Sequence, residues 1–109
     1  MLLGRVIGTV VATQKDPNLL SFKLQLVRRV DLEARDESGF VVAVDAVGAG
    51  VGDIVIYATG SSARQTDLTR DKPVDAVLVG IVDTWDVEGE IKYRKYPGDA
   101  GTKSEEVGV

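Results

Sequence analysis

Cysteine and histidine are both missing from the 109 residues of this chain. Their absence excludes disulfide bonds, thiolate nucleophiles, imidazole acid–base catalysis and zinc sites built from nitrogen and sulfur ligands. No hydrophobic run approaches the roughly 20 residues that a membrane-spanning helix needs. We therefore expect no membrane partner, and the absence of cysteine fits the reducing cytoplasm.

Basic residues are also in short supply. Lysine and arginine number 13 against 17 acidic residues, which leaves a net charge of −4. Phosphate binding usually needs a basic face, so this balance argues against a nucleic-acid partner. The length predicts one domain. The N-terminus opens directly into an alternating pattern that contains Arg5, so we expect no signal peptide there.

Alternating apolar and β-branched residues predict strands, whereas helix signals are weak. The expected strands cover residues 2–13, 22–27, 40–47, 54–58 and 74–85. Residues 61–71 have room for a short helix with Ser61 or Ser62 as its N-cap. Five strands with short connections predict an all-β fold, a small five-stranded OB-like barrel.

The composition changes beyond Asp86. Val87 to Ile91 predicts a small hairpin, with residues 91–95 as its return strand. From Pro97 onward the chain is rich in glycine and charge, which is typical of a flexible tail. We therefore divide the chain into a β-barrel domain (1–87), a C-terminal hairpin extension (88–96) and a tail (97–109).

Two of the expected strands are apolar on both faces. A small antiparallel barrel in water should carry polar residues at every second position. Residues 76–82 do not follow this rule, and residues 40–44 barely do. A single small chain is not expected to bury both faces, so the pattern predicts an oligomer.

Three motifs invite a chemical interpretation. Residues 48–52, Gly-Ala-Gly-Val-Gly, lack the spacing and following helix of a dinucleotide-binding loop, so a strand connection with glycines at positive φ is the simpler interpretation. Residues 60–64, Gly-Ser-Ser-Ala-Arg, could bind an anion but lack the lysine of a P-loop. The alternative is a helix cap followed by a solvated or ion-paired arginine.

Scattered carboxylates and aromatics give two weaker hypotheses. Several aspartates could form a metal or acid–base site, although nothing in their spacing requires one: Asp45, Asp53, Asp75, Asp83 and Asp86. Trp85, Tyr93 and Tyr96 could form a stacking platform for single-stranded nucleic acid, as in some OB-folds. Packing of the C-terminal hairpin is the simpler role for these rings.

Four segments in order resemble the pentameric vertex proteins of bacterial microcompartment shells, the EutN/CcmL family. They are Met1 to Thr13 (MLLGRVIGTVVAT), Val47 to Asp53 (VGAGVGD), Gly60 to Arg64 (GSSAR) and Pro73 to Asp83 (PVDAVLVGIVD). The resemblance covers roughly residues 1–87 and rests on their combination.

The resemblance implies a structural protein without catalytic residues, cofactor or metal. Five copies would form a ring that caps the vertices of a cytoplasmic shell, next to hexameric and trimeric shell proteins. It places a shell-contact loop at Gly48, Ala49, Gly50, Gly52 and Asp53. It places the subunit interface at Gly60, Ser61, Ser62, Ala63 and Arg64, where an arginine fork suits a carboxylate of the adjacent subunit. The alternative function is an OB-fold nucleic-acid-binding module.

Overall fold

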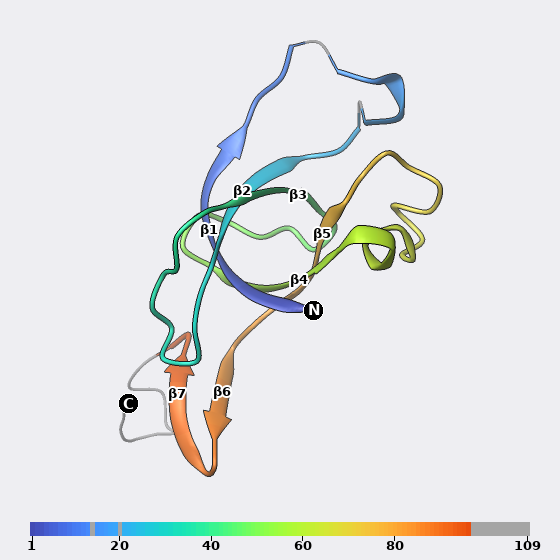
Figure 1. The fold of residues 1–109 in the computed structure, drawn as a ribbon. Coiled ribbons are helices and arrows are strands. Elements are labelled where there is room, and N and C mark those ends of the chain that lie inside the picture. Colours follow the sequence, from blue (N-terminus) through green and yellow to red (C-terminus); the bar gives the residue numbers. More distant parts are fainter. Residues whose placement is uncertain (14, 20, 97–109) are drawn as a thin grey trace.

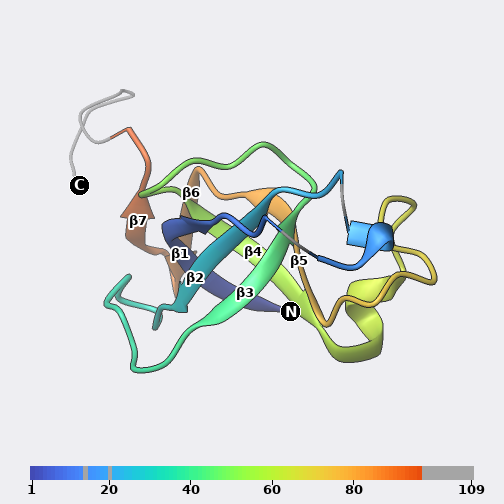
Figure 2. The same ribbon diagram turned by 90° about the horizontal axis from the view of Figure 1, so that it is seen from above.

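The computed structural model describes residues 1–13, 15–19 and 21–96, and within them five strands close into a barrel (Figures 1 and 2). The strands are β1 (Leu2–Val10), β2 (Leu24–Arg29), β3 (Val41–Asp45), β4 (Ile54–Thr59) and β5 (Ala76–Ile81). Around the barrel they follow the order β1-β2-β3-β5-β4, and β4 pairs back to β1. The predicted OB-like fold class is therefore confirmed.

The interior of the barrel is formed by the inward residues of neighbouring strands. Val6, Val27 and Val41 lie opposite one another across β1, β2 and β3, on the same inner face. Gly4 has to be a glycine, because a Cβ there would come within 2.5 Å of Val27 Cγ1 and 2.8 Å of Tyr57 Cε1. The buried cluster consists of Val6, Val27, Ala43, Ala49, Val55, Tyr57, Ala76 and Leu78.

The segment expected to form one strand from 74 to 85 is broken at Val82 and Asp83. The Val82 N–H donates to the Ile54 carbonyl at 2.8 Å, and the Lys95 N–H donates to the Asp83 carbonyl at 2.7 Å. These bonds direct the chain out of the barrel into a separate hairpin of β6 (Thr84–Val87) and β7 (Glu90–Arg94), below the barrel in Figure 1. The expected hairpin is present, but its first strand starts at Thr84.

The short helix expected within residues 61–71 forms only over the first part of that range, and as a 3₁₀ helix. Only short 3₁₀ turns occur in the described residues, η1 (Pro17–Leu19) and η2 (Gly60–Arg64). Neither Ser61 nor Ser62 is the N-cap of η2, because Thr59 holds that position without a side-chain cap bond. The buried Thr69 hydroxyl donates to the Ala63 carbonyl at 2.5 Å, and such side-chain bonding to the backbone competes with helix propagation.

The segment that follows η2 covers the outer face of β5. Val77 points outward from the barrel but is fully buried, in a second cluster with Ala63, Val74 and Phe22. A single chain therefore does bury both faces of β5 at Val77, contrary to the expectation for residues 76–82. The same is not true of β3, where Val42 remains 42% exposed. The tail predicted at 97–109 lies outside the described residues.

Candidate functional site: the glycine loop and the 60–64 turn

The glycine loop, residues 47–53, joins β3 to β4, and the Asp45 carboxylate at the end of β3 organises its start. The carboxylate accepts hydrogen bonds from the N–H groups of Val47 at 2.9 Å, Gly48 at 2.8 Å and Ala49 at 2.9 Å. Backbone donors in a turn would otherwise need water as their partner. The first half of the loop is thus held in one conformation by its own subunit.

Gln25 supports this arrangement from inside the barrel. Its side chain is 1% exposed, and its Nε2 donates to the Ala49 carbonyl at 2.8 Å and to Asp45 Oδ2 at 3.2 Å. Its Oε1 accepts from the Thr9 hydroxyl at 2.9 Å. The role of Gln25 was not predicted from the sequence. The available signal was its place two positions before Val27, on the strand face that points into the core.

The second half of the loop is tied to β1. The Gly52 N–H donates to the Val6 carbonyl at 2.8 Å, and the Val6 N–H donates to the Asp53 carbonyl at 2.9 Å. Asp53 Oδ2 accepts from the Gly50 N–H at 2.8 Å. Gly48 and Gly52 have positive φ values of 76° and 95°. Gly50 does not, so the expected positive φ is confirmed only at the outer two glycines.

Burial divides the predicted contact residues of the loop into two groups. Ala49 is 1% exposed and packs in the barrel core, while Asp53 is half-buried with its Oδ1 3.6 Å from Lys95 Nζ. The surface of the loop is formed by exposed residues: Gly48, Gly50, Val51 and Gly52. Val51 is 68% exposed, although it was not among the predicted contact residues. The available signal was an apolar residue between two glycines of the loop.

The 60–64 turn, which coincides with η2, begins directly after β4. Gly60 has a φ of 62°, and its N–H donates to the Asp75 carbonyl at 2.9 Å. Ala63 is fully buried beneath the turn. Arg64 Nη1 donates to the Val74 carbonyl at 3.0 Å, which ties the turn to the segment before β5. Ser61 and Ser62 are exposed.

The glycine loop and the 60–64 turn are not brought together. The six residues of β4 separate them, a length of about 20 Å for an extended strand. The loop lies at the start of β4 and the turn at its end (Figure 1). The molecule therefore presents two separate candidate contact surfaces rather than one cleft.

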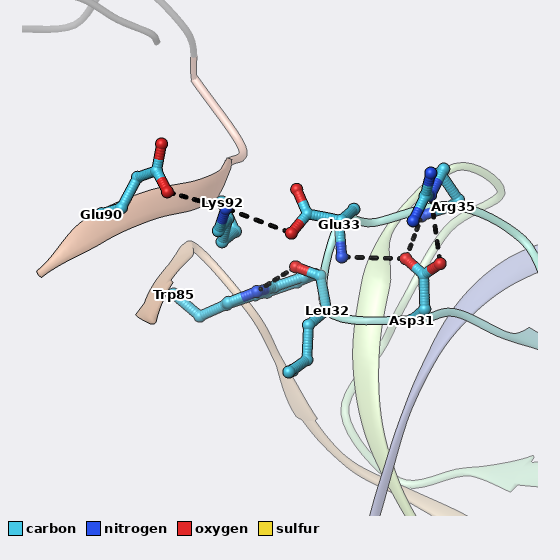
Figure 3. A network of polar contacts seen from close by, with 7 residues as sticks. All are labelled: Asp31, Leu32, Glu33, Arg35, Trp85, Glu90 and Lys92. Carbon is cyan, nitrogen blue, oxygen red and sulfur yellow. Dashed lines mark hydrogen bonds and ion pairs between the residues drawn. The ribbon is translucent and has the colours of Figure 1, made fainter. Parts of the chain in front are cut away.

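Two of the three C-terminal aromatics, Trp85 and Tyr93, pack as the simpler interpretation predicted, whereas Tyr96 is 56% exposed. Trp85 and Tyr93 stack with ring centroids 5.0 Å apart. Trp85 Nε1 also donates to the Leu32 carbonyl at 2.9 Å, as Figure 3 shows. Lys92 Nζ lies 3.1 Å from a Glu33 oxygen and 2.8 Å from a Glu90 oxygen. The contacts of Trp85 with Leu32 and of Lys92 with Glu33 hold the hairpin against the β2–β3 connection.

The described residues contain neither a metal-binding cluster nor a membrane-spanning helix. No group of three or more acidic residues lies close enough together to hold a metal ion. Within the same residues, no helix has the length and apolar character that crossing a membrane requires.

Comparison with known proteins agrees with this architecture. A family model described as ethanolamine utilisation protein EutN/carboxysome matches residues 1–83. The microcompartment shell vertex protein PduN of Salmonella typhimurium is 52% identical over 88 residues, covering 77% of this chain and 97% of PduN. The carboxysome shell vertex protein CcmL of Gloeobacter violaceus is 41% identical over 95 residues, covering 87% of this chain and 95% of CcmL.

Solved structures give the same result. The structure of Gloeobacter violaceus CcmL superposes with a TM-score of 0.83 at 41% identity, covering 87% of this chain and 98% of that one. The pentameric microcompartment shell protein GrpN of Rhodospirillum rubrum gives a TM-score of 0.74 at 47% identity, covering 80% of this chain and 99% of GrpN. In sequence and in fold, this chain belongs to the EutN/CcmL family.

Proposed function

We propose that this chain is a structural subunit of a bacterial microcompartment shell in the cytoplasm, and that five copies form a ring that caps a shell vertex. The observation that carries the proposal is the joint match in sequence and fold to chains named as shell vertex proteins. One of these, GrpN, is named as pentameric at 47% identity. The role is structural rather than enzymatic.

A ring of this kind has a geometric purpose. Hexagonal tiles alone form a flat sheet, and pentagons introduce the curvature that closes it. A five-fold ring needs two different surfaces on each subunit, related by a rotation that closes. Hexameric and trimeric shell proteins are the neighbours that such a ring would meet at its rim.

We assign the rim contact to the glycine loop. Its exposed glycines permit close approach of another backbone, and exposed Val51 adds apolar surface. In this assignment Ala49 and Asp53 act within the subunit, by filling the core and by fixing the loop. The hydrogen bonds that Asp45 accepts from the loop and the one that Gln25 donates to it hold the loop in shape before any neighbour arrives, which lowers the entropy cost of binding.

We assign the 60–64 turn to the boundary between ring subunits. Ser61, Ser62 and Arg64 are exposed there, whereas Gly60 and Ala63 shape the turn. Arg64 already donates one hydrogen bond to the Val74 carbonyl, which orients its guanidinium group. The remaining donors of that group suit a carboxylate on the next subunit.

Two measurements test the proposed function. Light scattering of the purified chain should give the mass of five subunits, and a stable monomer at micromolar concentration would contradict the ring. Co-expression with hexameric and trimeric shell proteins should give closed shells, whereas omission of this chain should leave open ones. Closed shells that form equally well without it would contradict the vertex role.

A further inference from the structure

We propose that Lys95, at the end of the C-terminal hairpin, is a positioning residue for the glycine loop. Through its ion pair with Asp53 it holds the exposed middle of the loop in the shape that meets neighbouring shell proteins. The inference rests on the rim contact proposed above and goes further, because it gives the hairpin a part in that contact. The family model matches residues 1–83 and does not extend to Lys95.

The ion pair joins two segments that are remote in the sequence. Lys95 directly follows β7, and Asp53 directly precedes β4. Lys95 Nζ lies 3.6 Å from Asp53 Oδ1, and the two side chains are only 23% and 24% exposed. For comparison, the side chains of the Arg29–Glu37 pair are 58% and 44% exposed. Because partly buried charges are screened less than exposed ones, the Lys95–Asp53 attraction is stronger than that of a fully exposed pair at the same distance.

Asp53 uses its second carboxylate oxygen to hold Gly50. Its Oδ2 accepts from the Gly50 N–H at 2.8 Å, and the Asp53 N–H donates to the Gly50 carbonyl at 3.1 Å. These two bonds close a turn around the exposed Val51, which lies between the two residues. One carboxylate therefore contacts the hairpin through Oδ1 and fixes the middle of the loop through Oδ2.

Lys95 is itself held in place by the hairpin. Its N–H donates to the Asp83 carbonyl at 2.7 Å, at the point where the chain leaves the barrel. Its Nζ lies 5.5 Å from the centre of the Tyr96 ring, within the range of a cation–π contact. A lysine that forms an ion pair normally loses side-chain freedom, and this loss offsets much of the attraction. Because the backbone bond and the ring already restrict Lys95, less freedom remains to be lost.

The surroundings of Lys95 keep its ammonium group charged. Burial lowers the pKa of Lys95, but the negative charge of Asp53 raises it, with smaller contributions from Tyr96 and Asp83. The net effect is a pKa above the ordinary value of 10.5. Lys95 is therefore a cation at neutral pH, as its role toward the Asp53 carboxylate requires.

The first half of the loop does not depend on this contact. The Gly48 N–H donates to Asp45 at 2.8 Å, and Gln25 supports Asp45 from the barrel interior. Gly50, by contrast, is held by the carboxylate that the hairpin contacts. Loss of the Lys95 charge should therefore loosen Gly50 and leave Gly48 protected, whereas a general loss of stability would affect both.

Amide hydrogen exchange of the assembled protein tests this coupling. In Lys95→Met, the Gly50 N–H should exchange about two- to fivefold faster than in the wild type, in keeping with the modest energy of such ion pairs. Gly48 exchange should not change, and Lys95→Arg should keep wild-type exchange because it retains the charge. Lys72→Met is the matched control, since it removes the same charge from the segment before β5. Unchanged Gly50 exchange in Lys95→Met, or equal acceleration at Gly48 and Gly50, would overturn the proposal.

A double substitution shows whether Lys95 acts through Asp53. Asp53→Asn keeps a side-chain oxygen for the Gly50 N–H but removes the charge that Lys95 contacts. Adding Lys95→Met to Asp53→Asn should therefore not accelerate Gly50 exchange any further, because residues that act through one contact are not additive. A further acceleration as large as that of Lys95→Met alone would show that Lys95 acts by another route and would refute the proposal.

Co-expression with hexameric and trimeric shell proteins tests the consequence for assembly. Lys95→Met should give fewer closed shells than the wild type, and Lys95→Arg should give as many. Normal closure by Lys95→Met, together with faster Gly50 exchange, would overturn the part of Lys95 in the shell contact. A wild-type chain that closes no shells would instead overturn the proposed function, whereas the exchange experiment would still decide the link between Lys95 and the loop.

Discussion

The buried side-chain amide of Gln25 and the backbone carbonyl of Ala49 are joined by a hydrogen bond of 2.8 Å, which anchors the glycine loop to the barrel interior. The same amide also donates to Asp45, which in turn accepts the loop N–H groups. A strand residue thus fixes the shape of a loop that is remote from it in sequence. The loop is therefore tied to the barrel by hydrogen bonds from Gln25 and to Asp45.

Replacing Gln25 with leucine should destabilise the subunit. The Ala49 carbonyl would lose its side-chain partner, and an unsatisfied buried polar group costs about 1–3 kcal/mol. Urea unfolding should show this loss, and hydrogen exchange should show faster exchange at Gly48. Thr9→Ser is the control: it retains the hydroxyl that donates to Gln25 Oε1, so its effect should be smaller. Equal effects would contradict the anchoring role.

The glycines of the loop should differ in their tolerance of alanine. Gly52 has a φ of 95°, which L side chains rarely adopt, so Gly52→Ala should cost roughly 1–2 kcal/mol of unfolding free energy. Gly50 lacks a positive φ, and its added Cβ would approach only Asp53 Oδ2, at 3.9 Å. Gly50→Ala should therefore leave the unfolding free energy almost unchanged. Chemical denaturation of both variants provides the comparison, and equal losses would refute it.

The barrel strands could be predicted from the sequence because their signal is local. Alternation of apolar residues identified β1 and β4 within a few residues, since it reflects side chains on opposite faces of one strand. The break at Val82 and Asp83 could not be predicted in this way. Both neighbouring segments have strand-like residues, and the break depends on bonds to the remote Ile54 carbonyl and Lys95 N–H.

The candidate site was predictable only in part, for a similar reason. The glycine loop is a contiguous motif, so its position was recognised before its geometry was known. The support from Gln25 depends on a residue that is 24 positions away from Ala49. The burial of Val77 depends on Phe22 and Val74, which no strand pattern relates to it. Long-range packing therefore decided which apolar faces remain exposed.

The contact of Lys92 with Glu90 should show in a titration. The hydrogen bond from Lys92 holds the pKa of Glu90 below its ordinary value of 4.5, and the bonds to Glu90 and Glu33 hold the pKa of Lys92 above 10.5. The contact therefore stabilises the hairpin fully between pH 4.5 and 10.5. This stabilisation is lost as the pH falls through the lowered pKa of Glu90, or rises through the raised pKa of Lys92.

Carbon-detected NMR provides the measurement. In Lys92→Met the pKa of Glu90 should rise toward its ordinary value, because the hydrogen bond that lowers it is gone. Lys72→Met is the control, since Lys72 lies in the segment before β5 and not in this contact. An unchanged Glu90 pKa in Lys92→Met would show that the ion pair does not form in solution.

Trp85 should clasp the hairpin through two separable interactions. Trp85→Phe removes the hydrogen bond to the Leu32 carbonyl but retains a ring against Tyr93, so it should cost about 0.5–1.5 kcal/mol. Trp85→Ala also removes the stacked pair. This costs about 0.5–1.5 kcal/mol in addition to the free energy that is lost with the buried apolar area. Hydrogen exchange should locate the loss in β6 and β7 while β1 to β5 stay protected, because in the described residues β6 and β7 pair with each other and not with the barrel strands. Loss of protection throughout the barrel in Trp85→Ala would show instead that the hairpin is part of the barrel's folding unit.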